Sequence, residues 1–487
     1  MTGVLKILRW SLKYGTTKHT SRAIGLYGLV ETALGNLEGG TKACAIALQL
    51  AEEQGILTSE YAPTASVYGF VFPWTHPLHT CQKRLYEGYK VGLQTGDMEY
   101  AMMNIALYGF FCYSTGKPLS NLEADMRDYA EQMEECNMML QLKFLSLTWQ
   151  TILNLLGRSN DPLVLTGEAM DQDEILADAE RENNPPLKAQ LYCHQLQLAV
   201  YLCDFTLASS ILKHTSCIGA VNPANPIIWR TALFEGITAF EMAQQGNKKH
   251  RAVGTKSLKK VKGWVDQGNP NCVHILYLLQ AEKFHCDGSI EEARTHFDKS
   301  IVTAARNGFL SDRALANERC ARMYQRMKDD YWAKEYFHRS YEIYVELEAR
   351  VKVEQLQKVH PSLRPSEDHS IATEQSRKNP DKFADRTSVS EELPFTVFTV
   401  DSDEMADIHD ISAVLGDMED DDETPIPSSN SVTQSGPFSI RRESTMKRQS
   451  ISGVAAQKVL SWDLAATTML ALGSTGGDDD MTETDSQ

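Results

Sequence analysis

The sequence contains no run that approaches the ~18 consecutive apolar residues of a membrane-spanning helix, and it has no signal peptide with a cleavage site. Its ten cysteines are scattered through apolar stretches and never form a C-x-x-C pair. Such cysteines are typical of reduced, buried thiols in a cytosolic protein rather than of a disulfide framework or a redox motif. We therefore expect a cytoplasmic protein that is not anchored in a membrane.

The sequence also has very little of the period-two alternation of β-branched residues that marks half-buried strands. Helical periodicity dominates residues 1–355 instead, and short turns rich in Gly, Asn and Asp separate the periodic segments. The sequence therefore predicts an all-α protein.

The motifs of common catalytic sites are missing as well. There is no G-x-S-x-G, no H-E-x-x-H and no kinase H-R-D or D-F-G set. The nearest approach to a phosphate-binding loop starts at Gly35, but Thr41 and Lys42 stand in the reverse of the order that such a loop needs. His76–Cys81 holds three possible zinc ligands, yet zinc requires a fourth ligand or an open position, and no second cluster offers partners. We therefore expect no catalytic residue, no cofactor and no metal.

Negative charge is unevenly distributed along the chain. The 487 residues carry a formal net charge of −17, but residues 361–487 alone hold 25 Asp and Glu against 10 Lys and Arg. The same segment has only five aromatic residues, and Ser, Thr and Asp dominate it. Such a composition buries too little apolar surface to offset the entropy lost on ordering. We expect a disordered, acidic, Ser/Thr-rich tail over residues 358–487, which argues against nucleic-acid binding by that tail.

A sequence motif that recurs at a spacing of forty residues indicates how the helices are arranged. In each copy a turn opens a helix that carries an Ala, a Phe four residues later and a Ser three residues beyond that. This alternation of small and large side chains lets a second helix pack closely, as in helix-turn-helix repeats. The positions are Ala293, Phe297 and Ser300 in one copy and Ala333, Phe337 and Ser340 in the next, and looser copies of the small-residue position fall at Ala101 and Ala208.

One such unit cannot bury its apolar face alone, so the repeat implies stacked neighbours. We predict a tetratricopeptide-like α-solenoid of divergent helix pairs, each of about forty residues, over residues 1–357. An acidic stretch near 157–186, with a break at Pro185-Pro186, is expected to interrupt the array as a long loop with a short helix inside it. The stacked pairs should leave a concave groove that suits a helix or an extended peptide.

Three sequence segments of the predicted helical part resemble the helical repeat region of very large multidomain signalling proteins. They are Tyr89–Ala101, Phe144–Leu156 and Asn307–Glu318, and the resemblance covers about residues 10–357. Those proteins carry a kinase-like domain and a predicted AAA-type (STAND) ATPase before this region, and GAF, histidine-kinase or cyclase modules after it. The resemblance implies a solenoid between an ATPase and an output domain, and this sequence contains the motifs of neither.

Our first expectation is a non-catalytic, intracellular protein–protein interaction scaffold in signalling, with unknown protein partners and contact with neither nucleic acid nor membrane. The alternative is a section of a larger ATPase/kinase signalling protein that is enzymatic only with its flanking domains. A third alternative is a mitochondrial adaptor, because no acid precedes Glu31 while Lys6, Arg9 and Lys13 are basic.

A basic patch stands out between Glu241 and Asp266. Seven basic residues lie within Lys248–Lys262 without an intervening acid. Such a run is usually a solvated helix face, but it also suits phosphates or an acidic partner. The chain's own acidic segment Asp417–Glu423 is another possible partner, which predicts an intramolecular contact.

Two serines of the tail are candidate phosphorylation sites. Ser444 follows Arg441 and Arg442, and Ser450 follows Lys447 and Arg448 at the same offset. A kinase with an acidic substrate groove recognises basic residues placed in this way, and phosphorylation adds up to two negative charges at each site.

Overall fold

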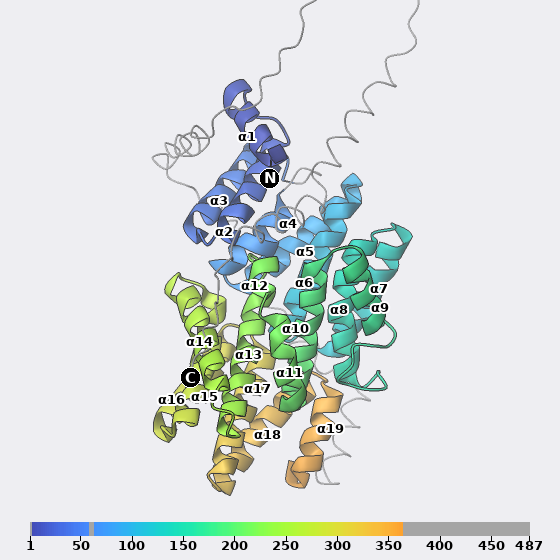
Figure 1. Ribbon diagram of the computed structural model, residues 1–487. Coiled ribbons are helices and arrows are strands. Elements are labelled where there is room, and N and C mark those ends of the chain that lie inside the picture. Colours follow the sequence, from blue (N-terminus) through green and yellow to red (C-terminus); the bar gives the residue numbers. More distant parts are fainter. Residues whose placement is uncertain (1, 58–62, 364–487) are drawn as a thin grey trace, which may run out of the picture.

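A computed structural model describes residues 2–57 and 63–363 of the chain, and these residues form nineteen α-helices and four short 3-10 or π turns (Figure 1). No strand occurs in these two ranges, so the expected all-α fold is confirmed. The tail is expected from residue 358, but the last helix runs to Val359 and a short turn covers Pro361–Leu363, so the helical part ends later than expected. From residue 364 onwards the tail lies outside the described residues, as do Ser444, Ser450 and the acidic segment Asp417–Glu423.

The helices and turns have the following bounds: α1 (Thr2–Tyr14), α2 (Thr20–Ala33), α3 (Leu37–Glu53), α4 (Thr64–Ser66), η1 (Val67–Val71), η2 (Phe72–Trp74), α5 (Leu78–Thr95), α6 (Met98–Thr115), α7 (Leu119–Glu135), α8 (Met139–Leu156), α9 (Gln172–Arg181), α10 (Pro185–Tyr201), α11 (Phe205–Thr215), α12 (Ile218–Val221), α13 (Ile227–Gln244), α14 (His250–Asp266), η3 (Pro270–Cys272), α15 (Val273–Asp287), α16 (Ile290–Arg306), α17 (Leu310–Arg326), α18 (Asp330–Glu346), α19 (Arg350–Val359) and η4 (Pro361–Leu363).

Most consecutive helices pack as adjacent pairs joined by short turns. Gly288, with φ of 80°, ends α15, and Lys328, with φ of 61°, follows α17. A residue in this left-handed conformation closes a helix, and an acceptor side chain can then cap the next one. At the start of α18 the carboxylate of Asp329 accepts a hydrogen bond from the backbone N–H of Trp332 at 3.2 Å. The main pairs are α2/α3, α5/α6, α7/α8, α10/α11, α13/α14, α15/α16 and α17/α18.

The helices divide into inner helices, which are buried on every side, and outer helices, which are buried along one stripe. Every residue of α13 from Ile227 to Glu241 is buried. In α16 the buried residues are Ala293, Phe297, Ser300 and Ala304, which lie on a single face. A helix without an exposed face belongs to the interior, and a helix with one apolar stripe covers it. Helices α6, α8 and α10 resemble α13, whereas α7, α11 and α14 resemble α16.

The forty-residue repeat lies where an outer helix meets its inner partner. Ser300 Oγ of α16 donates a hydrogen bond to the carbonyl oxygen of His274 in α15, and Ser340 Oγ of α18 donates one to that of Ala314 in α17. Both bonds are 2.9 Å long, and both reach 26 residues back along the chain. The two copies therefore use the same packing contact. The other residues of the repeat are also buried: Ala293, Phe297, Ala333, Phe337, Ala101 and Ala208.

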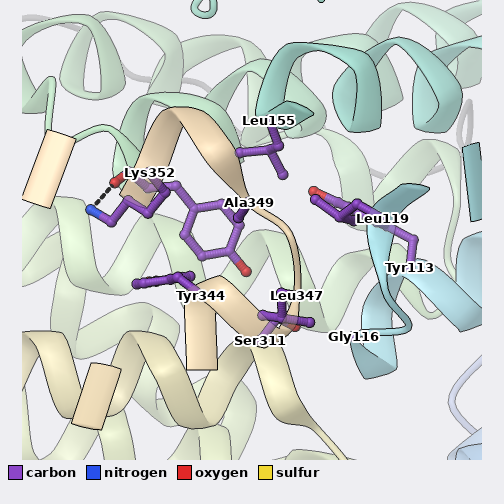
Figure 2. A pocket seen from close by; sticks show the side chains of 10 residues that line it. Tyr113, Gly116, Leu119, Leu155, Ser311, Tyr344, Leu347, Ala349 and Lys352 are labelled. Carbon is purple, nitrogen blue, oxygen red and sulfur yellow. Dashed lines mark hydrogen bonds between the residues drawn. The ribbon is translucent and has the colours of Figure 1, made fainter. Parts of the chain in front are cut away.

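The C-terminal helices fold back onto the inner helices. The backbone N–H of Leu119 donates to the carbonyl oxygen of Leu347 at 3.1 Å, and Lys352 Nζ donates to the carbonyl oxygen of Tyr201. Figure 2 shows this contact, where Tyr344 and Leu347 face Tyr113 and Leu119. The cavity left there is about 20 Å³, which holds about one water molecule and no larger ligand. The C-terminal helices therefore contact α6, α7 and α8, and the expected concave groove stays a prediction.

The segment expected to interrupt the array near 157–186 contains a short helix, as the sequence suggested. Helix α9 occupies Gln172–Arg181, and α10 begins at Pro185. A proline in the first turn of a helix costs no hydrogen bond, because the N–H groups there have no partner within the helix. The Pro185-Pro186 pair therefore ends the interrupting segment and forms the first turn of α10.

The basic N-terminal segment forms α1, which packs against α2. Val4 and Leu8 are buried against Ala23, and Lys6, Arg9 and Lys13 lie on the same helix. No helix within the described part of the chain is long and apolar enough to cross a bilayer.

Truncation of a repeat phenylalanine tests the packing. Phe337 of α18 is 1% exposed and Tyr331 of the same helix is 74% exposed. We expect Phe337→Ala to lower the free energy of unfolding by about 3–5 kcal/mol, because it removes a fully buried ring. Tyr331→Ala should change it by less than about 0.5 kcal/mol. Urea denaturation measures both, and equal effects of the two substitutions would contradict the packing described.

Candidate functional site

Helix α17 places a carboxylate between two other inner helices. Asp312 accepts hydrogen bonds from the Arg230 guanidinium of α13 and from His274 Nε2 of α15, the latter at 2.7 Å. Burial opposes ionisation of Asp312, but the positive charge of Arg230 and the hydrogen bond from His274 outweigh it and lower the pKa of Asp312 to about 2. The contact therefore joins three inner helices by charge in the protein interior.

About two turns further along α17, Arg319 pairs with two carboxylates. Its guanidinium lies 2.6 Å from the carboxylate of Glu241 in α13 and 2.5 Å from that of Glu282 in α15. All three side chains are at most 3% exposed. Burial raises the pKa of Glu241, but the charges of Arg319 and Arg326 lower it to about 2.

The neighbouring residue of α17 ties the C-terminal helices to the array. Glu318 lies 2.7 Å from Lys352 Nζ of α19, and it accepts a hydrogen bond from the Tyr344 hydroxyl of α18 at 3.1 Å. Against the cost of burial, the charges of Lys352 and Arg322 lower the pKa of Glu318 to about 2. These three contacts form a buried network of ion pairs around α17.

One buried carboxylate does not follow this pattern. Glu235 of α13 is 7% exposed and accepts a hydrogen bond from the Thr215 hydroxyl at 2.7 Å. It forms no ion pair with any residue in 2–57 or 63–363. Every other buried carboxylate in those ranges has a basic partner: Asp97 with Arg22, Glu123 with Arg127 and Arg158, Glu241 and Glu282 with Arg319, Asp312 with Arg230, and Glu318 with Lys352.

Glu235 lines a cleft of about 280 Å³ where the N-terminal helices meet the middle of the chain. The α2–α3 turn forms one side, and α12, α13 and α14 form the other, as Figure 1 allows the reader to follow. Trp74 and Trp264 line the same cleft, with ring centroids 5.8 Å apart and planes at 80°. Trp74 is fixed in place because its Nε1–H donates to the carbonyl oxygen of Ala224 at 2.8 Å.

The electrostatics of the cleft differ from those of the network around α17. Burial raises the pKa of Glu235, and the Thr215 hydrogen bond and the charges of Lys260 and Lys256 only partly oppose this. Both lysines belong to α14 and are exposed. The pKa of Glu235 is therefore shifted in the opposite direction to those of Glu241, Asp312 and Glu318.

The basic patch of the sequence forms the exposed face of α14 and the turn before it. All seven residues are exposed, and two have acidic partners: Arg251 pairs with Asp287, and Lys262 lies 2.6 Å from Asp266. The other five form no ion pair with a residue that the structure describes: Lys248, Lys249, Lys256, Lys259 and Lys260.

The remaining candidate motifs have structural surroundings. Gly39 and Gly40 lie inside α3, so the glycine-rich stretch is helical and forms no phosphate loop. The His76 ring stacks on Phe72 with centroids 4.4 Å apart, and Cys81 is buried in the core. The structure brings together no group of three or more His, Cys, Asp or Glu side chains that could hold a metal ion within the ranges it describes.

Removal of Arg319 tests the buried network. Arg319→Met leaves Glu282 without a basic partner and Glu241 with Arg326 alone, and we expect it to lower the free energy of unfolding at pH 7 by about 3–5 kcal/mol. Arg339→Met, which breaks an exposed ion pair with Glu335, should cost less than about 1 kcal/mol. An Arg319→Met protein as stable as the wild type would contradict the role of the network.

The network also predicts the direction of acid unfolding. A carboxyl group whose folded pKa is lowered stabilises the fold above its unfolded pKa, and this contribution is lost as the pH falls. For Glu241 and Glu318 the loss runs from the unfolded value of 4.5 down to about 2. Urea titrations between pH 7 and pH 2.5 should show stability falling in this window, and a pH-independent stability would be inconsistent with the ion pairs.

Glu235→Gln should have the opposite effect to Glu241→Gln, although both residues lie on α13. A raised pKa means that ionised Glu235 destabilises the fold as the pH rises, so its amide should stabilise the protein by about 1 kcal/mol at pH 7. The gain should shrink in acid, where the wild-type carboxyl is protonated. Thermal unfolding at pH 7 and pH 4.5 measures both variants, and a loss of stability in Glu235→Gln at pH 7 would count against an unpaired carboxylate.

Comparison with known proteins places this chain in no family. No model of a known protein family matches the sequence, and no curated protein matches it. The resemblance carried by Tyr89–Ala101, Phe144–Leu156 and Asn307–Glu318 therefore stays a prediction.

Proposed function

We propose that this chain is a non-catalytic protein–protein interaction scaffold in intracellular signalling, and that α14 offers a docking face for an acidic segment of a partner. One observation carries this proposal. Lys256, Lys259 and Lys260 are exposed and form no ion pair with the described residues, and their i, i+3, i+4 spacing puts them on one face of the helix.

The geometry favours an acidic peptide over nucleic acid. Single-stranded nucleic acids bind through a basic groove lined with several aromatic side chains on which bases stack. Near these lysines the structure places Trp264, which is half-buried in the adjoining cleft, and Trp74, which is buried beside it, so neither forms an exposed row for stacking. A short acidic segment needs only the row of positive charges. The attraction between exposed charges weakens as the salt concentration rises.

The chain itself carries a segment of the required charge. Asp417–Glu423 contains six acidic residues and lies outside the described residues. The 53 residues between Leu363 and Asp417 span at most roughly 180 Å when fully extended. We propose that this segment competes with the partner for α14, and that phosphorylation of Ser444 and Ser450 regulates the competition.

Charge reversal on α14 tests the docking face. The probe is a fluorescent peptide of residues 415–426, titrated into the full chain at two salt concentrations. We expect Lys256→Glu, Lys259→Glu and Lys260→Glu together to weaken binding by on the order of tenfold or more, because three attractive charges become repulsive. A matched control reverses three exposed lysines of other helices: Lys83, Lys299 and Lys334.

Two outcomes separate docking from competition. If the α14 variant binds the peptide as well as the control does, the docking face is wrong. A second full-length protein replaces the acidic residues of 417–423 by Asn and Gln, and it should bind the peptide more tightly than the wild type. Equal binding by this variant and the wild type would contradict the intramolecular competition, while the proposed docking face on α14 would still stand.

A further inference from the structure

We propose that the cleft lined by Glu235, Trp74 and Trp264 is a binding site for an organic ammonium ion, a positively charged amine attached to an apolar or aromatic body. This site is distinct from the lysine face of α14. It would recognise a cation, whereas that face would recognise an acidic segment.

The first argument is the exception that Glu235 makes among the buried carboxylates. Six others in the described ranges are each paired with Arg or Lys, whereas the hydrogen-bond donors of Glu235 are the neutral hydroxyls of Thr215 and Ser257. Burying a carboxylate without a positive partner costs free energy, and selection normally removes such groups unless they contact something. A ligand cation in the cleft would give Glu235 the partner that each of the others finds within the protein.

The second argument is the aromatic lining beside that carboxylate. An indole ring attracts a cation over its face more strongly than the rings of Phe or Tyr do. Trp74 and Trp264 stand at 80° to each other and both line the cleft. Two such rings and one carboxylate together provide the usual environment of an alkylammonium group in a protein.

The third argument is the size and character of the cleft. Its volume of about 280 Å³ lies just below the range of about 300–1,000 Å³ that is common for drug-sized ligands. Apolar side chains such as Leu37, Ile218 and Ile228 complete the lining. The cleft therefore suits an amine with one aromatic ring or a short aliphatic chain, and it is too small for a nucleotide.

Lys260 lies at the same cleft, and its charge opposes that of a bound cation. The charge of Lys260 therefore affects the two proposed ligands in opposite directions. Replacing Lys260 by a neutral residue should strengthen binding of an amine and weaken binding of an acidic peptide. The two proposals can therefore fail independently.

Isothermal titration of the full chain with phenethylammonium tests the inference, with benzoate as an anion of similar shape. We expect saturable binding of the amine and none of benzoate. Glu235→Gln should weaken amine binding by on the order of tenfold, Trp264→Ala should weaken it, and Lys260→Ala should strengthen it. The control variant is Glu292→Gln, which neutralises an exposed carboxylate of α16 and should leave binding unchanged.

A second titration, with Nα-acetyl-lysine amide, distinguishes a free amine from a lysine side chain of a peptide as the source of the cation. Thermal unfolding shows that each variant is folded before it is titrated. Absence of amine binding up to about 10 mM, equal binding of benzoate, or undiminished amine binding by folded Glu235→Gln would each overturn the proposal.

Discussion

The ion pairs that α17 makes in the interior are the constraint on which the arrangement of the helices depends. Inner helices that are buried on every side still carry Asp, Glu, Arg and His, and each of these groups must find a partner. Arg319 does so by bridging Glu241 of α13 and Glu282 of α15, while Asp312 joins the same helices through Arg230 and His274. A buried pair adds little net stability over an apolar pair, but any stacking that separates its members leaves a buried charge. The network therefore favours one register of α13, α15 and α17 over the alternatives.

The same network ties the C-terminal end of the described chain to the inner helices. Glu318 pairs with Lys352 of α19, and Leu347 accepts a hydrogen bond from the backbone of Leu119. The proposed docking face lies instead on an outer helix. On the outer side lie the exposed lysines of α14 and, beside them, the cleft with Glu235, which is the one buried carboxylate of the described ranges that forms no ion pair.

Local features of the fold could be predicted from the sequence, and long-range features could not. The spacing of Ala293, Phe297 and Ser300 reflects contacts within one helix pair, so it is visible as a repeat. The contact of Leu119 with Leu347 joins residues far apart in the sequence, and no local pattern signals it. The Pro185-Pro186 pair was likewise a local signal, because proline is tolerated in the first turn of a helix and α10 begins there.

The candidate site shows the same limit at the level of single residues. Glu235 and Glu241 lie on one helix among similar apolar neighbours, and in the sequence they look alike. Arg319, almost eighty residues further along than Glu241, pairs with Glu241 and not with Glu235. Glu241 is therefore part of the buried network, whereas Glu235 lies beside a cleft. The basic run before Asp266 was visible, because a cluster of like charges is a local property.

The central claim is that this protein binds acidic partners through its outer face and not through its interior. Amide hydrogen exchange, followed by mass spectrometry on the full chain with and without the 415–426 peptide, measures this most directly. The account predicts slower exchange confined to α14 and the turns beside it. Slower exchange in α6, α8 or α10 with none in α14 would contradict it.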